Sequence, residues 1–92
     1  MSSVSVVIPV YHEQDSVPRL HEALAKVADA AAGTWELIFV DDGSRDGTWE
    51  ALLAIRAQDP RVRAIRLKRN FGHTAAMACG IEHGKLGTFL FI

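Results

Sequence analysis

Four consecutive residues, Asp41-Asp42-Gly43-Ser44, carry the strongest chemical signal in the chain, and they directly follow the apolar run 37–40. A carboxylate at the end of a strand can accept hydrogen bonds from a ribose hydroxyl or a base N–H. Gly43 permits a tight turn and the close approach of a ligand. The same residues can instead form a turn that caps the next helix, with an aspartate bonded to its own backbone. Taken alone, these four residues leave a binding site and a structural turn both open.

Two further polar segments follow apolar runs. The first holds Pro9, Tyr11 and Glu13 and lies at the end of the β-branched run 4–10. It offers a carboxylate and an aromatic ring, which can stack on a nucleobase or cover the core. The second segment contains Arg69 and leads into a helix rich in small residues, so Arg69 and the helix start could face a diphosphate. A solvated basic turn is the alternative for that segment.

The elements that must position these segments alternate along the chain. Strands are predicted over residues 4–10, 37–40, 62–67 and 88–92. Helices are predicted from a cap at Asp15 or Ser16 to Gly33, from a cap at Asp46 to residue 58, and over residues 74–83. This alternation predicts an α/β fold with a parallel sheet, right-handed crossovers and helices on both faces.

The polar segments should meet at one rim of this sheet. Ligands of such folds bind beyond the carboxyl ends of the strands. The loops expected at those ends span residues 11–15, 41–45 and 68–72, and they are the most polar segments of the chain. Arg63 and Arg66 interrupt the third strand with charge, which predicts that it lies at an edge of the sheet.

Composition limits the class of protein. Ninety-two residues predict a single domain over residues 1–92. A hydrophobic fraction of 49% with 23% charged residues is ordinary for a globular domain and argues against disorder. The net charge of −1 shows no excess of the basic residues that nucleic-acid-binding proteins usually have, so no nucleic-acid partner is expected. Cys79 is the only cysteine, so no internal disulfide can form and a cytoplasmic, reducing location is expected.

Several common ligand motifs are absent from the sequence. No Gly-x-Gly-x-x-Gly fingerprint follows the first predicted strand, and no phosphate loop ends in Gly-Lys-Ser/Thr. The four histidines lack the spacing of metal ligands: His12, His21, His73 and His83. No apolar run approaches the roughly 18 residues of a membrane helix. We therefore expect neither a metal site nor a membrane span within these residues.

Three motifs together resemble a known family. They are VVIPVYHE at residues 6–13, FVDDGSRDGT at residues 39–48 and RNFGH at residues 69–73. They resemble the amino-terminal half of a family 2 glycosyltransferase with the GT-A fold. The third motif is most similar to that of the polyprenyl-phosphate sugar transferases, the group of dolichyl-phosphate mannose synthase and its bacterial relatives.

The resemblance implies a sheet order of 3-2-1-4, a Rossmann-like nucleotide-binding half and a UDP- or GDP-sugar donor. It also implies roles for six residues: Pro9, Tyr11 and Glu13 in the base and ribose pocket, Asp41 on the base or ribose with Asp42 beside it, and Arg69 toward the diphosphate. The implied reaction is transfer of the sugar to an acceptor, such as a polyprenyl phosphate.

The sequence departs from the family pattern at two places. His12 stands where an asparagine is usual. The fourth strand of the family leads into an Asp-x-Asp motif that holds a divalent metal, Mg²⁺ or Mn²⁺, and the sequence stops at Ile92, before that motif. Metal ligands, catalytic residues and any membrane association are therefore expected outside this chain. The isolated chain is expected to be inactive.

The apolar residues 88–92 predict a last strand at an edge of the sheet, from which we expect self-association of the chain. Two other functions stay open. One is a non-catalytic α/β module that binds a nucleotide or a partner. The other is a doubly wound regulatory domain with an acidic cluster, which would leave Pro9 and Tyr11 unexplained.

Overall fold

The computed structural model describes residues 3–84 in full and residues 88–91 by their backbone. The elements along the chain are β1 (Ser3–Val10), α1 (Val17–Ala30), β2 (Thr34–Asp41), α2 (Thr48–Gln58), β3 (Val62–Arg66), α3 (His73–His83) and β4 (Thr88–Phe91). Every predicted strand and helix is present, and β2 begins earlier than its apolar run suggested. No helix among the described residues is long and apolar enough to span a membrane.

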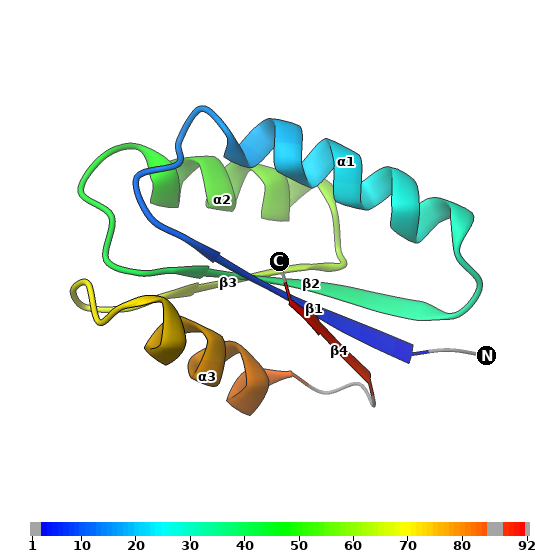
Figure 1. The fold of residues 1–92 in the computed structure, drawn as a ribbon. Helices are drawn as coiled ribbons and strands as arrows, with labels where there is room; N and C mark the ends of the chain where they lie inside the picture. Colours follow the sequence, from blue (N-terminus) through cyan, green and yellow to red (C-terminus); the bar gives the residue numbers. More distant parts are fainter. Residues whose placement is uncertain (1–2, 85–87, 92) are drawn as a thin grey trace.

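The strands form one parallel sheet in the order β3-β2-β1-β4. Helices α1 and α2 cover one face of the sheet and α3 covers the other (Figure 1). The predicted α/β fold class is therefore confirmed, and β3 lies at an edge as its arginines indicated. The opposite edge is β4. Its side chains lie outside the described residues, so the expected self-association through them stays a prediction.

Strand alternation divides the core into two layers. Val6 and Ile8 of β1 point to the face that packs against Leu24 of α1 and Leu52 of α2. Val7 points to the other face, where it packs with Ile38 and with Ala76 of α3. Because successive side chains of a strand alternate between faces, the continuous apolar run of β1 serves both layers.

The small residues of α3 bring this helix close to the sheet. A Cβ atom built on Gly80 would lie 2.3 Å from Cγ1 of Val7. No side chain larger than hydrogen fits this contact without movement of β1 or α3. The close packing expected for this helix is therefore present, and Gly80 is the residue that requires it.

The structure agrees with one of the two predicted helix caps and corrects the other. Helix α1 begins after Ser16, one of the two predicted cap positions, although the Ser16 side chain makes no cap hydrogen bond. At α2 the cap position is Gly47, one residue after the predicted Asp46. Asp46 still serves the first turn, because its Oδ1 accepts a hydrogen bond from the backbone N–H of Thr48 at 2.9 Å. The Thr48 hydroxyl also donates to Asp46, and this bond lowers the pKa of the carboxyl.

The carboxyl ends of β1, β2 and β3 lie together at one end of the molecule, on the left of Figure 1. Three loops leave that end: residues 11–16 between β1 and α1, residues 42–47 between β2 and α2, and residues 67–72 between β3 and α3. The polar segments predicted from the sequence therefore lie together at this rim.

Candidate functional site

The β2–α2 loop holds the β1–α1 loop through side chains. The backbone N–H of His12 donates to Oγ of Ser44 at 2.8 Å, and the N–H of Glu13 donates to Oγ1 of Thr48 at 2.8 Å. In the reverse direction, the N–H of Gly47 donates to Oε1 of Gln14 at 2.7 Å. These bonds fix the backbone directly after Tyr11 and at Glu13, the two residues whose side chains were predicted to line the base and ribose pocket.

Asp42 holds the β3–α3 loop on the other side. Its Oδ1 accepts a hydrogen bond from the N–H of Phe71 at 2.8 Å. Its Oδ2 accepts one from the N–H of Gly72 at 3.0 Å and one from Nδ2 of Asn70 at 3.1 Å. Asp42 is only 4% exposed. The carboxylate is thus a buried connection between the end of β2 and the loop that carries Arg69.

Gly43 brings the same two loops into backbone contact. Its φ of 77° lies in the left-handed region, which side chains other than hydrogen rarely adopt. A Cβ at this position would lie 2.3 Å from the carbonyl carbon of Arg69 and 2.6 Å from the backbone nitrogen of Asn70. The close approach predicted for Gly43 therefore involves the protein's own β3–α3 loop.

Asp41 is fully buried at the end of β2. Its Oδ1 accepts a hydrogen bond from the N–H of Ser44 at 2.9 Å. Its Oδ2 has no hydrogen-bond partner among the residues that the structure describes. An unpaired carboxylate oxygen in a buried place is costly, and such costs persist mainly where a site uses the group.

A cavity of about 770 Å³ opens at the rim, between the ends of β2 and β3 and the side of Tyr11. Its lining comes from all three loops: Tyr11, His12, Gly43, Ser44, Arg45, Arg66, Leu67, Lys68, Arg69 and Asn70. Four of these residues are cationic and none is acidic, although the chain as a whole has a net charge of −1. The cavity therefore favours an anionic ligand.

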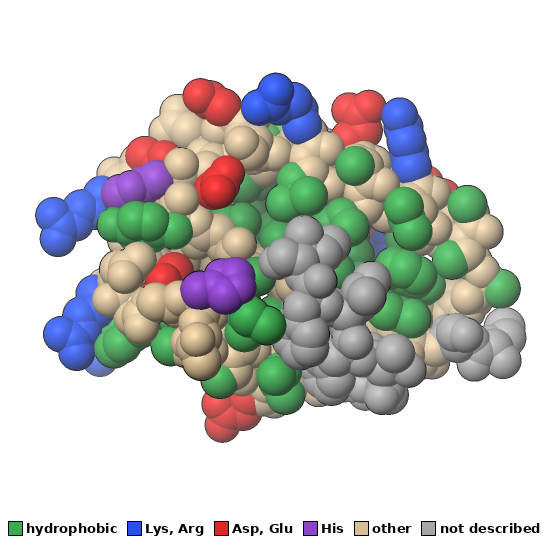
Figure 2. Space-filling view, viewed as in Figure 1, with side chains coloured by type: hydrophobic (Ala, Val, Ile, Leu, Met, Phe, Trp, Pro, Cys, Tyr) green, Lys and Arg blue, Asp and Glu red, His purple; other side chains and the backbone are tan. Residues whose placement is uncertain are grey.

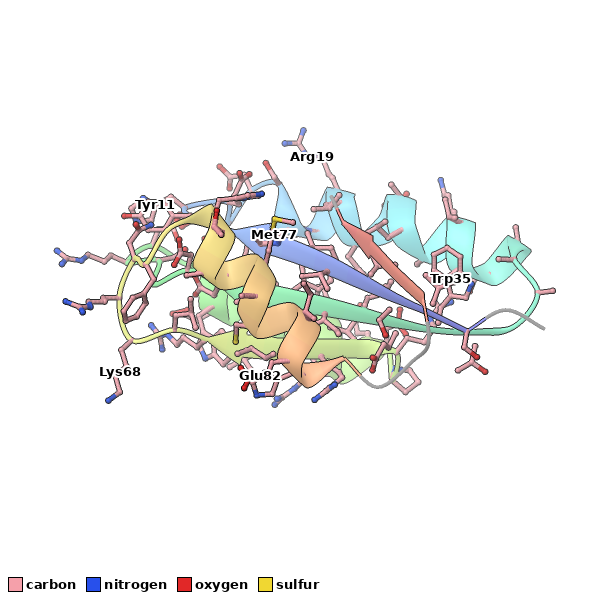
Figure 3. All side chains as sticks on the ribbon, turned by 60° about the horizontal axis from the view of Figure 1, so that its bottom comes forward. Tyr11, Arg19, Trp35, Lys68, Met77 and Glu82 are labelled. Carbon is pink, nitrogen blue, oxygen red and sulfur yellow. The ribbon has the colours of Figure 1, made fainter. Side chains whose placement is uncertain are left out.

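The figures locate this cationic rim. Lys and Arg side chains project from the left end of the molecule in Figure 2, where the three loops lie in Figure 1, and others project along its top. Figure 3 shows Tyr11 and Lys68 at that same end, with Trp35 at the opposite end. Tyr11 is 42% exposed, so its ring is accessible to a ligand.

A second, smaller cavity of about 280 Å³ lies between the end of β1 and the start of α3. The residues lining it include Pro9, Tyr11, Glu13, Asp42 and His73. Tyr11 lines both cavities and stands at their boundary.

The six residues predicted to bind nucleotide-sugar thus all lie at the rim. Arg69 and Tyr11 line the larger cavity, while Pro9, Glu13 and Asp42 line the smaller one. Asp41 lines neither cavity, but it is bonded to Ser44, which lines the larger one. No ligand contact tests these assignments, so they stay predictions.

Sequence reasoning missed three cavity residues. Arg66 was used only to place the third strand at an edge, and Lys68 and Arg45 lay in predicted loops without a ligand role; all three line the larger cavity. The guanidinium of Arg66 lies 5.5 Å from the Trp49 ring centroid. A usable signal was available, because each of these residues follows or ends a strand at its carboxyl end.

The backbone conformation at residue 12 accounts for its residue type. His12 has a φ of 51°, the only positive φ of a non-glycine residue among the described part of the chain. Asparagine, aspartate and histidine are the residues that tolerate this conformation best. The ring of His12 also stacks on Tyr11, with centroids 3.9 Å apart. Histidine can therefore replace the usual asparagine without a change of loop conformation.

The described residues contain no group of three or more His, Cys, Asp or Glu side chains that could hold a metal ion. Asp41 and Asp42 are adjacent in sequence, but the Asp42 carboxylate is committed to N–H donors of the protein. These residues therefore do not fit a metal centre.

Comparison with known proteins identifies the family. The family model described as "Glycosyl transferase family 2" matches residues 5–92. The chain belongs to glycosyl transferase family 2. The family 2 resemblance read from the three motifs is thereby confirmed.

Curated relatives in this family are several times longer than the chain. Over 84 residues it is 38% identical to the undecaprenyl-phosphate 4-deoxy-4-formamido-L-arabinose transferase of Salmonella choleraesuis, covering 90% of this chain and 26% of the relative. Over 81 residues it is 38% identical to the uncharacterized glycosyltransferase YkcC of Bacillus subtilis, covering 88% of this chain and 25% of the relative. The chain therefore spans about a quarter of the length of these relatives.

Solved structures share the fold of this family 2 chain. TarS of S. aureus, residues 1–349 in complex with UDP, superposes with a TM-score of 0.84 at 25% identity, covering 100% of this chain and 27% of that one. The mannosyltransferase PcManGT of Pyrobaculum calidifontis, in complex with GDP-Man and Mn²⁺, superposes with a TM-score of 0.80 at 21% identity, covering 89% and 24%.

Proposed function

We propose that the rim of this chain binds the donor of a sugar transfer, a UDP- or GDP-sugar. The larger cavity carries the proposal, because its lining combines an exposed aromatic ring with four cationic side chains and no acidic one. A nucleoside diphosphate presents a flat base and a compact double negative charge, so it matches both features. The names of two neighbours in the same fold, which are complexes with UDP and with GDP-Man, support this ligand class.

The base and ribose are assigned to the β1 and β2 ends of the rim. Tyr11 stacks on the base, and Pro9 and Glu13 line the pocket beside it. Oδ2 of Asp41 is assigned a hydrogen bond from the base or a ribose hydroxyl, which would supply the partner this buried oxygen otherwise lacks. Because Asp41 is fully buried and lines neither cavity, this contact requires the loop at Ser44 to move when the nucleotide binds. Ser44 keeps the other oxygen of Asp41 occupied and so fixes the direction of the carboxylate.

The diphosphate is assigned to the β3 side of the larger cavity. Arg69 faces it there, with Arg66 and Lys68 adding positive charge to the same lining. In the transfer, an acceptor oxygen forms a bond to the anomeric carbon of the sugar. The bond from that carbon to the diphosphate oxygen breaks, and the nucleoside diphosphate leaves with the electron pair. Cationic side chains near that oxygen stabilise the charge that develops on it.

The acceptor and the remaining parts of the reaction belong to the whole protein. We propose a polyprenyl phosphate as acceptor, by analogy with the undecaprenyl-phosphate transferase among the relatives. A divalent metal is proposed for the whole protein, with ligands outside the described residues, as Mn²⁺ is present in the PcManGT complex. We assign no catalytic residue within the chain. Residues outside it are proposed to associate with a membrane at its cytoplasmic face.

A transfer assay tests the proposed function. The protein that carries this chain, at its full length, is incubated with UDP-sugars or GDP-sugars, undecaprenyl phosphate and Mn²⁺ or Mg²⁺. We expect a glycolipid and free nucleoside diphosphate from one donor class, and no turnover with the 92-residue chain alone. Nucleotide binding by the full-length protein without transfer to any acceptor would instead support the non-catalytic binding module.

A further inference from the structure

We propose that Asp42 is a positioning residue: its carboxylate holds the β3–α3 loop so that Arg69 faces the diphosphate, and it does not itself touch the nucleotide. This inference rests on the proposed function and assigns a different task to each of the two adjacent aspartates.

The carboxylate of Asp42 holds the β3–α3 loop through hydrogen bonds. The carboxylate accepts from three donors of one short loop, at 2.8 Å from Phe71, 3.0 Å from Gly72 and 3.1 Å from Asn70. Both oxygens are therefore engaged, and the side chain is almost fully buried. Hydrogen bonds to an ionised acceptor are stronger than neutral ones, so three of them fix the loop firmly.

The β3–α3 loop in turn restrains Arg69. The Phe71 N–H is bonded to Asp42, and the guanidinium of Arg69 lies 4.7 Å from the Phe71 ring centroid. On the other side, the backbone of Arg69 packs directly on Gly43. Arg69 is thus held at its backbone by Gly43 and at its side chain by Phe71, and Asp42 sets the position of Phe71.

Charge argues against direct contact between Asp42 and the diphosphate, although Asp42 lines the smaller cavity. A carboxylate beside a diphosphate would repel it, unless a cation stood between them. Asp42 is already surrounded by N–H donors, which leave little capacity for a further partner. Asp41 differs in this respect, because one of its oxygens has no partner among the described residues.

A double-mutant cycle in the full-length protein tests the inference. The variants are Asp42→Asn, Arg69→Ala and both together, titrated with UDP and GDP and with the matching nucleosides uridine and guanosine. Asp42→Asn keeps one acceptor oxygen but places an NH₂ group where two N–H donors point. Asp15→Asn removes one charge from the β1–α1 loop, outside the lining of both cavities, and is the control.

We expect each single substitution to weaken binding of the nucleoside diphosphate by about tenfold, with the nucleoside affinity unchanged. The double variant should bind no more than about twofold more weakly than Arg69→Ala, because residues acting through one another are non-additive. Additive losses, or an Asp42→Asn variant that binds like the wild type, would overturn the inference. A merely structural role would lower the affinity for nucleoside and diphosphate alike.

Two further results separate the possible failures. If Asp42→Asn does not fold, Asn70→Ala removes one of the three donors and should show the same non-additivity with Arg69→Ala at smaller size. A wild-type protein that binds neither UDP nor GDP overturns the proposed function, and this inference with it. A wild type that binds, with additive losses in the variants, overturns the inference alone.

Discussion

A Cβ atom on Gly43 would lie 2.3 Å from the carbonyl carbon of Arg69, so the β2–α2 and β3–α3 loops touch through their backbones at this point. The contact makes the two loops one unit. It also means that the ends of β2 and β3 present their polar groups at a fixed separation, without dependence on flexible side chains.

Gly43→Ala should disturb this unit. The substitution adds strain from the positive φ and a clash with backbone that cannot rotate away, so we expect about 2–4 kcal/mol of destabilisation and weaker UDP or GDP binding. Urea unfolding and ligand titration measure the two effects. Gly47→Ala is the matched control, because Gly47 has a φ of −82° and the three atoms nearest to its Cβ all belong to the end of the Gln14 side chain. Equal losses from the two substitutions would contradict the backbone contact.

The close packing of α3 predicts a second stability effect. Gly80→Ala forces a methyl group against Val7, so we expect about 1–3 kcal/mol of destabilisation in urea unfolding. Ala78→Leu adds a larger group on the exposed side of the same helix and should change the free energy of unfolding by less than about 0.5 kcal/mol. A Gly80→Ala protein as stable as the wild type would show that α3 lies farther from the sheet.

Replacements at residue 12 test its backbone conformation. His12→Asn should keep the midpoint of thermal unfolding, since asparagine also adopts a positive φ readily. His12→Val should lower stability by about 1–2 kcal/mol, because a β-branched residue is strained in that region. Equal stability of the Asn and Val variants would mean that the loop does not hold a left-handed residue.

Asp59 lies away from the rim and should make the stability of the fold depend on pH. Hydrogen bonds from Arg61 and from His21 hold the pKa of the Asp59 carboxyl far below its usual value. A carboxyl with a lowered pKa stabilises the fold above its unfolded pKa of about 4, and that stabilisation is lost as the pH falls below it. We expect Asp59→Asn to cost about 1–3 kcal/mol at pH 7 and progressively less below pH 4.

The control for Asp59 is another carboxylate bound to the same arginine. Asp29 accepts from Nη1 of Arg61 at 2.8 Å but has a largely exposed side chain. Asp29→Asn should therefore change the free energy of unfolding by less than about 1 kcal/mol. The free energies of unfolding of both variants, measured in urea at pH 7 and pH 3, test this prediction. A cost of Asp59→Asn that does not shrink at low pH would show that the ion pair is not its source.

The order of elements and the place of the rim could be predicted from the sequence, because the alternation of apolar runs with helical spacings is compatible with only one class of topology. The edge position of β3 followed from its two arginines. The cap of α2 was misplaced by one residue, since Asp46 and Gly47 are both acceptable at that position and the difference depends on loop geometry.

The contacts between loops could not be read from the sequence. Asp42 and Phe71 are 29 residues apart, and no pattern in either segment predicts their hydrogen bond. For the cavity side chains Arg66 and Lys68, the sequence indicates a place at the carboxyl end of a strand but not that they share one cavity, because their neighbours along the chain are basic as well. Which cations share a cavity depends on how three loops pack, and that information appears only in the folded chain.

The most direct test of the central claim is a calorimetric titration of the full-length protein with UDP and with GDP, for the wild type and for Asp41→Asn. The substitution keeps the oxygen that accepts from Ser44 and removes the buried acceptor that has no partner among the described residues. We predict that the wild type binds one of the two nucleotides and that Asp41→Asn weakens this binding by about tenfold or more while the midpoint of thermal unfolding is kept. A wild type that binds neither nucleotide, or an Asp41→Asn protein with unchanged affinity, would contradict the assignment of this rim as a nucleotide-sugar site.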